Sequence, residues 1–121
     1  MIRRHVYWSA AGLTGALGLA HLALAWPLYQ RMTLDGLWFV GSGLAIIMAA
    51  TVNVVALRTG SGEARWLVAG VNATMAGFFC LAWSLLKEPQ VLVGLALFVV
   101  MSGSALTMRG SAAHSRSQSR V

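Results

Sequence analysis

Residues 35–57 read DGLWFVGSGLAIIMAATVNVVAL, an apolar run whose only charge, Asp35, stands at its first position. A helix of about 20 residues crosses the ~30 Å hydrocarbon core of a bilayer. The run is therefore long enough to span a membrane. Three further runs of similar length and character lie at residues 6–26, 66–86 and 90–108.

The composition of the whole chain agrees with a membrane protein. Of its 121 residues, 58% are hydrophobic and 10% are charged, whereas soluble domains carry roughly 25% charged residues. With so few charges, most of the surface has to face a medium as apolar as lipid. We predict an all-α membrane protein, in which residues 1–108 form a four-transmembrane-helix antiparallel bundle with short loops and residues 109–121 form a disordered basic tail.

Prolines and short polar residues mark the ends of the predicted spans. Pro27 is expected to stop the first span, because proline lacks an N–H and disfavours helix in the residue before it. Pro89 stands where the fourth span begins, and there a missing N–H costs nothing. Either Thr33 or Asp35 is expected to cap the free N–H groups at the start of the second span.

The basic residues predict the orientation of the chain. Seven arginines flank the spans on the side of the termini, namely Arg3, Arg4, Arg58, Arg65, Arg109, Arg116 and Arg120, against Arg31 and Lys87 on the other side. Since cytoplasmic segments carry the excess of Lys and Arg, both termini are expected in the cytoplasm. All five tryptophans, and with them Tyr7 and Tyr29, fall near predicted span ends, which is typical of an interfacial belt. The Ala/Gly/Leu/Arg-rich composition favours a bacterial inner membrane.

A second interpretation of the N-terminal run is a cleaved secretory signal. Two arginines precede the run, and Ala23-Leu24-Ala25 has the pattern of a cleavage site. The run is as long as a full span and carries Tyr7 and Trp8, features that favour an uncleaved helix.

Several function classes find no support in the residues. The net charge of +6 is spread singly or in pairs at span ends, without the basic stripe of a nucleic-acid-binding protein. The one cysteine, Cys80, excludes an internal disulfide and a CxxC redox centre. No Ser-His-Asp arrangement, Gly-rich phosphate loop or carboxylate pair is present. We therefore predict a protein that is not an enzyme and has no cofactor or metal site.

Small residues at four-residue spacing predict which helix faces pack together, because close approach drives helix association in lipid. The predicted stripes are Gly12, Ala16 and Ala20 beside Gly15 and Gly18 in the first span; Gly41, Ala45, Ala49 and Asn53 in the second; and Ala69, Ala73 and Gly77 beside Asn72, Ala76, Cys80 and Ser84 in the third. The fourth span is poorest in small residues before Gly103, so it is expected to face lipid most. The stripes predict association within one chain, between two copies as a homodimer, or in a larger membrane complex.

Three polar residues inside the spans are candidate ligand-binding residues: His21, Asn53 and Asn72. Asn53 and Asn72 fall at similar depth on antiparallel spans, so they are expected to hydrogen-bond to each other as structural contacts; a polar ligand site is the alternative. His21 lies well inside the first span, where an ionisable residue is a functional hypothesis. It is expected to point into the bundle, at the level of Ser42, Cys80 or Ser84.

The sequence supports two hypotheses of function. The first is a non-catalytic accessory, interaction or structural protein of the inner membrane, whose partners are the lipid bilayer and other helices. The second is a small carrier or ligand-binding protein with its site around His21, acting as a homodimer because four helices alone enclose little volume. A His21→Ala variant separates them: loss of activity with intact folding favours the second, and loss of stability favours a structural histidine.

Overall fold

The structure, a computed structural model, describes residues 1–107, and every regular element within them is a helix. The four helices are α1 (Ile2–Leu28), α2 (Leu34–Thr59), α3 (Gly62–Leu86) and α4 (Pro89–Thr107). Each is long and apolar enough to cross a membrane. The predicted helical class, with four helices long and apolar enough to span a membrane, is confirmed for this part of the chain. The tail predicted over residues 109–121 lies outside the described residues.

Side-chain caps set the starts of α2 and α3. The Thr33 hydroxyl accepts a hydrogen bond from the Gly36 N–H at 3.1 Å, and the Ser61 hydroxyl accepts one from the Ala64 N–H, also at 3.1 Å. Each satisfies one of the N–H groups that a helix start leaves without a partner. Thr33, one of the two predicted caps, is therefore the cap of α2, and Asp35 stands in the first turn behind it.

The helix ends show one departure from the sequence prediction. α2 ends at Thr59, and the residue after it, Gly60, caps the helix with φ 64°, a left-handed conformation that glycine adopts without steric cost. α4 begins at Pro89, as expected. The prediction that Pro27 stops the first helix is wrong, because α1 continues to Leu28 and closes with a 2.9 Å bond from the Tyr29 N–H to the Ala25 carbonyl. Proline has helical φ, and in the last turn its missing N–H removes a single bond.

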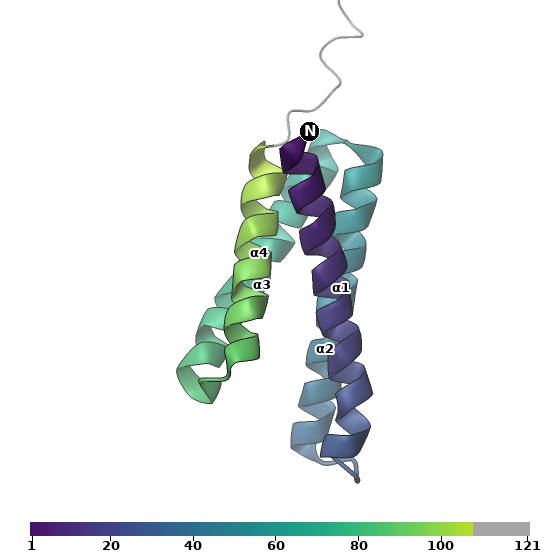
Figure 1. Cartoon of the computed structure of the whole chain (residues 1–121), viewed down its shortest axis with the longest axis vertical. Coiled ribbons are helices and arrows are strands. Elements are labelled where there is room, and N and C mark those ends of the chain that lie inside the picture. The colour runs from purple at the N-terminus through teal and green to yellow at the C-terminus, as the bar shows by residue number, and fades with distance from the viewer. Residues whose placement is uncertain (108–121) are drawn as a thin grey trace, which may run out of the picture.

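The helices form two hairpins, α1–α2 and α3–α4 (Figure 1). The most extensive packing is within each hairpin, and α1–α4 and α2–α3 contacts join the two hairpins. The hairpins lie close together at the end that carries the N-terminus and the α2–α3 turn, called the N-terminal end below (Figure 1). They diverge toward the opposite end, called the hairpin end, which carries the α1–α2 and α3–α4 connections.

Glycines set the close approach of helices inside each hairpin. A Cβ added at Gly18 of α1 would lie 2.9 Å from the backbone oxygen of Gly43 and 2.7 Å from Ile47 Cγ1 of α2. A Cβ added at Gly94 of α4 would overlap the ring of Phe79 of α3. Each hairpin is therefore packed around a position where only a hydrogen fits.

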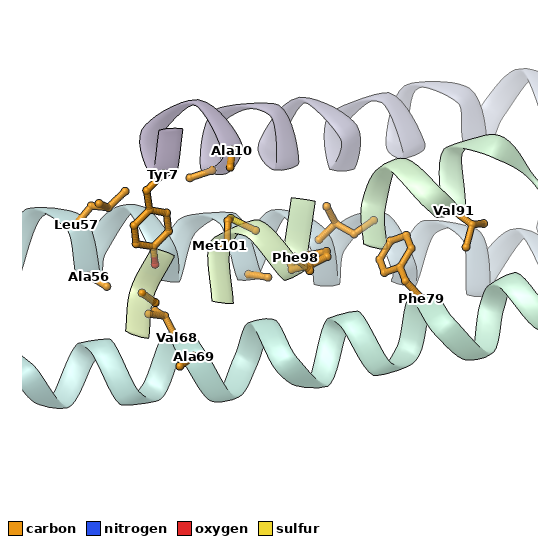
Figure 2. Packing of buried hydrophobic residues seen from close by; sticks show 14 residues of the cluster. Tyr7, Ala10, Ala56, Leu57, Val68, Ala69, Phe79, Val91, Phe98 and Met101 are labelled. Carbon is orange, nitrogen blue, oxygen red and sulfur yellow. The ribbon is translucent and has the colours of Figure 1, made fainter. Parts of the chain in front are cut away.

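The core runs along the helices between the two hairpins, from Tyr7 near the N-terminal end to Phe79 nearer the hairpin end. Figure 2 shows Tyr7 directed from α1 into the molecule, with Met101, Phe98 and Phe79 following it in a row toward Val91. All five side chains are buried. Many large apolar side chains of α1 and α2 near the hairpin end, such as Leu24, Trp26 and Trp38, are exposed.

Buried residues alternate at three and four positions along the helices. In α4 they are Val91, Gly94, Phe98, Met101 and Ala105, and in α2 they include Gly43, Ile46, Ala50, Asn53 and Leu57. This is the 3.5-residue repeat of left-handed helix packing. The expectation that the fourth helix faces lipid most is wrong, because α4 places a buried side chain at every position of this repeat and its packing is by large residues as well as small ones.

Of the residues in the predicted four-residue stripes, about a third are buried. Asn53, Ala49, Ala69, Asn72 and Gly18 are buried as predicted. Gly12, Ala16 and Ala20 of α1, Gly41 and Ala45 of α2, and Ala73, Gly77, Cys80 and Ser84 of α3 are exposed. A step of four residues drifts around the helix by about 40° each time, since a turn takes 3.6 residues, so a stripe that starts on the buried face leaves it within two or three steps.

Candidate functional site

The strongest polar contact between helices is a pair of amides. Asn53 Nδ2 donates to Asn72 Oδ1 at 2.8 Å, and Asn72 Nδ2 donates to Asn53 Oδ1 at 2.8 Å. Both side chains are 0% exposed. The predicted hydrogen bond between α2 and α3 is therefore confirmed, and it is reciprocal.

A tyrosine from a third helix joins the pair. Tyr7 of α1 is buried, and its hydroxyl donates to Asn53 Oδ1 at 2.6 Å. Asn53 Nδ2 also donates to the carbonyl of Ala49, one turn earlier in α2, at 2.8 Å. We call Tyr7, Asn53 and Asn72 the polar triad; it links α1, α2 and α3 near the N-terminal end.

The sequence prediction missed Tyr7, which it placed in the interfacial belt. A tyrosine near the end of a span fits that belt as well as a core. The signal that distinguishes the two is register: Tyr7, Ala11, Thr14 and Gly18 repeat at four, three and four residues, and all four are buried. Tyr7 therefore extends the packing face of α1 by one repeat.

The chemistry of the polar triad is that of a structural contact. Each oxygen and nitrogen of the three side chains has a hydrogen-bond partner. Amide side chains carry no ionisable proton, and in a low-dielectric interior a satisfied network fixes the packing of its helices. Thr14 adds a smaller contact between α1 and α4, where its buried hydroxyl lies 2.8 Å from the Ala10 carbonyl and 3.7 Å from Met101 Sδ.

His21 lies at the α1–α2 interface, in the half of the molecule nearer the hairpin end. Its ring stacks on Phe39 of α2 at a centroid distance of 4.8 Å and an interplanar angle of 21°. Its Nδ1 lies 3.1 Å from the Leu17 carbonyl in the preceding turn of α1. Tyr29 follows Phe39 at 5.5 Å. The histidine is thus half-buried in a row of rings along one hairpin.

Two of the residues predicted at the level of His21, Ser42 and Ser84, use their hydroxyls within their own helices. The Ser42 hydroxyl donates to the Trp38 carbonyl at 2.9 Å, and the Ser84 hydroxyl donates to the Leu81 carbonyl at 2.7 Å, each within its own helix. Cys80 is exposed. The predicted level agrees for Ser42, because a Cβ added at its neighbour Gly43 would lie 2.9 Å from the His21 Cβ. The His21 ring itself faces Phe39 across the α1–α2 contact.

The three predicted residues do not form one site. His21 and Tyr7 are fourteen positions apart on the same helix, about 21 Å at 1.5 Å per residue. The polar triad and the His21 ring row are therefore separate features at opposite halves of the molecule. Among residues 1–107, no group of three or more His, Cys, Asp or Glu side chains is placed to hold a metal ion.

An open apolar groove of about 630 Å³ lies between α1 and α4. Its walls are Ile2, His5, Val6, Ser9, Ala10 and Leu13 of α1 and Val93, Ala96, Leu97 and Val100 of α4. The groove adjoins neither His21 nor the asparagine pair.

Comparison of the chain with models of protein families, with curated proteins and with solved structures gives no match. Its function has to be inferred from its own residues.

Proposed function

We propose that the chain is a non-catalytic accessory protein of a bacterial inner membrane, which binds a transmembrane helix of a partner protein along the outer face of α3. The proposal includes an antiparallel four-helix bundle with both termini in the cytoplasm. It rests on the distribution of polar and small residues between the inside and the outside of the described helices.

The orientation is supported by the arginines near the N-terminal end and by rings at both ends. Lys87 lies over the Trp83 ring at 5.3 Å near the hairpin end, and Arg65 lies over the Trp66 ring at 5.7 Å near the N-terminal end. Such cation–ring pairs suit the two membrane–water interfaces, where aromatic residues gather. The excess of arginine at the N-terminal end favours the cytoplasmic side for it.

The observation that carries the proposal is a seam of small residues on the outside of α3. Its members are Gly70, Ala73, Gly77, Cys80 and Ser84, and all five are exposed. They repeat at three and four residues, as the packed faces inside the molecule do. A Cβ added at Gly70 or Gly77 would meet nothing within 4 Å. We call these five residues the α3 seam.

Small residues favour contact with another helix over contact with lipid. A glycine or alanine lets two helix backbones approach closely, and van der Waals packing of this kind drives helix association in a bilayer. Inside this molecule, Gly18, Gly43 and Gly94 have that role. The α3 seam has the same composition and spacing but no partner helix within the described chain.

The polar residues support a structural interior in place of a transport site. The side chains of the polar triad hydrogen-bond to one another and to the Ala49 carbonyl. The His21 ring stacks on Phe39, and its Nδ1 lies near the Leu17 carbonyl. The proposal therefore gives His21 a packing role, and the carrier hypothesis remains a prediction that the His21 variants described in the Discussion test.

The experiment is a set of bulky substitutions with matched controls. Ala73→Leu and Gly77→Leu enlarge the α3 seam, whereas Ala23→Leu on α1 and Gly103→Leu on α4 add the same bulk to exposed control positions. The full chain is purified in mild detergent, and the mass of the complex is measured together with the unfolding midpoint of each variant.

The proposal predicts a stoichiometric complex larger than the monomer, which the two α3 variants dissolve and the two control variants leave intact. The control variants should keep the unfolding midpoint of the complex, and the α3 variants should fall only to that of the isolated chain, because loss of a bound partner removes its stabilisation. A mass equal to two copies would count against the accessory role and favour the carrier hypothesis, which requires a homodimer. A protein that is monomeric before substitution, or a complex that all four variants affect equally, would overturn the proposal.

A further inference from the structure

The α1–α4 groove has the length of one membrane leaflet. Its wall on α1 extends from Ile2 to Leu13, about 16 Å at 1.5 Å per residue. Half of a ~30 Å hydrocarbon core is about 15 Å. Along α1 the groove therefore begins at the N-terminal end and ends near the middle of the membrane, and its wall on α4, Val93 to Val100, lies around the middle of that helix.

The walls suit a hydrocarbon chain. Except for His5 and Ser9, all residues that line the groove are apolar, and they come from two helices that pack less extensively on each other than the helices within each hairpin do. Figure 1 shows α1 and α4 drawing apart from the N-terminal end downward. An apolar wedge of this kind, open to the side, is the shape that an acyl chain fills.

The mouth of the groove is cationic. Arg3 and Arg4 are exposed on the first turn of α1, next to Ile2 and His5 of the groove wall. Among the described residues, the acidic side chains lie on other elements, Asp35 and Glu63 in the first turns of α2 and α3 and Glu88 in the α3–α4 connection. Arg3 and Arg4 are therefore the charged side chains of α1 at this end of the groove, and α1 carries no carboxylate.

We propose that the α1–α4 groove binds one anionic phospholipid of the leaflet at the N-terminal end, with an acyl chain in the groove and the phosphate at Arg3 and Arg4. Guanidinium groups bind phosphate through two parallel hydrogen bonds. The apolar wall selects a lipid over free phosphate, and the arginines select an anionic lipid over a zwitterionic one. The site is independent of the α3 seam, which lies on another helix.

The test is native mass spectrometry of the full chain in detergent, titrated with phosphatidylglycerol or with phosphatidylcholine that carries the same acyl chains. The proposal predicts one tightly bound phosphatidylglycerol per chain and weaker binding of phosphatidylcholine. A basic residue at a membrane surface contributes ~1 kcal/mol to lipid binding, which is about fivefold in affinity. The double variant Arg3→Gln/Arg4→Gln is therefore expected to bind phosphatidylglycerol about 25-fold more weakly.

The matched charge control is Arg31→Gln/Arg58→Gln, which removes the same charge from residues outside the groove and is expected to keep the bound lipid. Ala96→Phe fills the groove, and it should weaken binding of both lipids, whereas Ala45→Phe on α2 should not. Unfolding midpoints establish that each variant is folded; if Ala96→Phe is not, Ser9→Leu adds a smaller side chain to the opposite wall.

Four results would overturn the proposal: equal affinity for the two lipids, equal loss in the two double-arginine variants, binding that the groove-filling variants leave unchanged, or a dimer mass in place of a lipid adduct. Glycerol phosphate without acyl chains separates the lipid from its headgroup. The proposal predicts that glycerol phosphate does not displace the bound lipid at tenfold excess.

Discussion

Asn53 makes more side-chain hydrogen bonds than any other residue of the polar triad. It accepts from Tyr7 and from Asn72, and it donates to Asn72 and to the Ala49 carbonyl. Hydrogen bonds between membrane helices contribute ~0.6 kcal/mol on average and up to about 1.7. Removal of a shared residue also leaves its partners buried without a bond, which costs more than the bond itself.

We expect Tyr7→Phe to lower the free energy of unfolding by about 0.6 to 1.7 kcal/mol, since it removes one bond and keeps the ring. Asn53→Ala should lower it by about 2 to 4 kcal/mol, because the Tyr7 hydroxyl and the Asn72 amide then have no partner. Thr74→Ala, which removes only an exposed bond to the Gly70 carbonyl in its own helix, should have almost no effect. Unfolding in mixed micelles with increasing dodecyl sulfate measures all three, and an Asn53→Ala no worse than Tyr7→Phe would refute a shared network.

Two substitutions separate a packing role of the His21 ring from a role in binding a ligand or a proton. If its role is to stack on Phe39, His21→Phe keeps the contact and should leave the unfolding midpoint close to that of the unsubstituted chain. His21→Ala removes the ring and should destabilise by about 1 to 3 kcal/mol. A carrier site would give the opposite pattern: both variants would lose ligand or proton transport in reconstituted vesicles, whatever their stability.

At the scale of helices, glycine positions divide into two groups that the sequence does not separate. Gly18 has backbone atoms of Gly43 and Ile47 within about 3 Å of where a Cβ would stand, and Gly12 has nothing within 4 Å. Both belong to the first span, six positions apart. The structure thus assigns one to the α1–α2 contact and the other to the outside.

This difference predicts opposite effects of one methyl group. Gly18→Ala should push α1 and α2 apart and destabilise by about 1 to 3 kcal/mol, as overpacking does. Gly12→Ala should be neutral or stabilise by up to about 1 kcal/mol, because alanine is the better helix former. The dodecyl sulfate titration compares the two variants directly. Equal effects would mean that the close α1–α2 approach is absent in solution.

The sequence predicted the elements better than the faces. Length and apolar character identify four spans because a bilayer sets the required length. The Asn53–Asn72 bond was predictable because two amides at equal depth in neighbouring helices have few other partners in lipid. The rotation of each helix about its own axis was not predictable, because alanines and glycines occur on all sides of the helix. They fit a four-residue repeat as well as a 3.5-residue repeat. The partner of His21, Phe39, depends on that rotation, and so does the burial of Tyr7.

At the scale of the whole molecule, the proposed orientation requires the N-terminal end of the bundle to lie on the cytoplasmic side of the membrane and the hairpin end on the opposite side. In a chain with Cys80→Ala, Thr59→Cys lies at the N-terminal end and Gln30→Cys at the hairpin end. A membrane-impermeant maleimide added to intact cells should label Gln30→Cys and should label Thr59→Cys only after the cells are opened. The reverse pattern would contradict the proposed orientation and leave the helical packing unaffected.

The central claim is that the α3 seam contacts a helix from outside the chain, and photo-crosslinking in native membranes tests it most directly. A photoreactive amino acid is placed at Gly77 of the seam and, in a second sample, at Val99 of α4; both positions are exposed, and both lie about two to three turns from the hairpin end of their helices. The account predicts one discrete protein adduct from position 77, which Ala73→Leu abolishes, and only lipid adducts from position 99. Lipid adducts alone from both positions would contradict it.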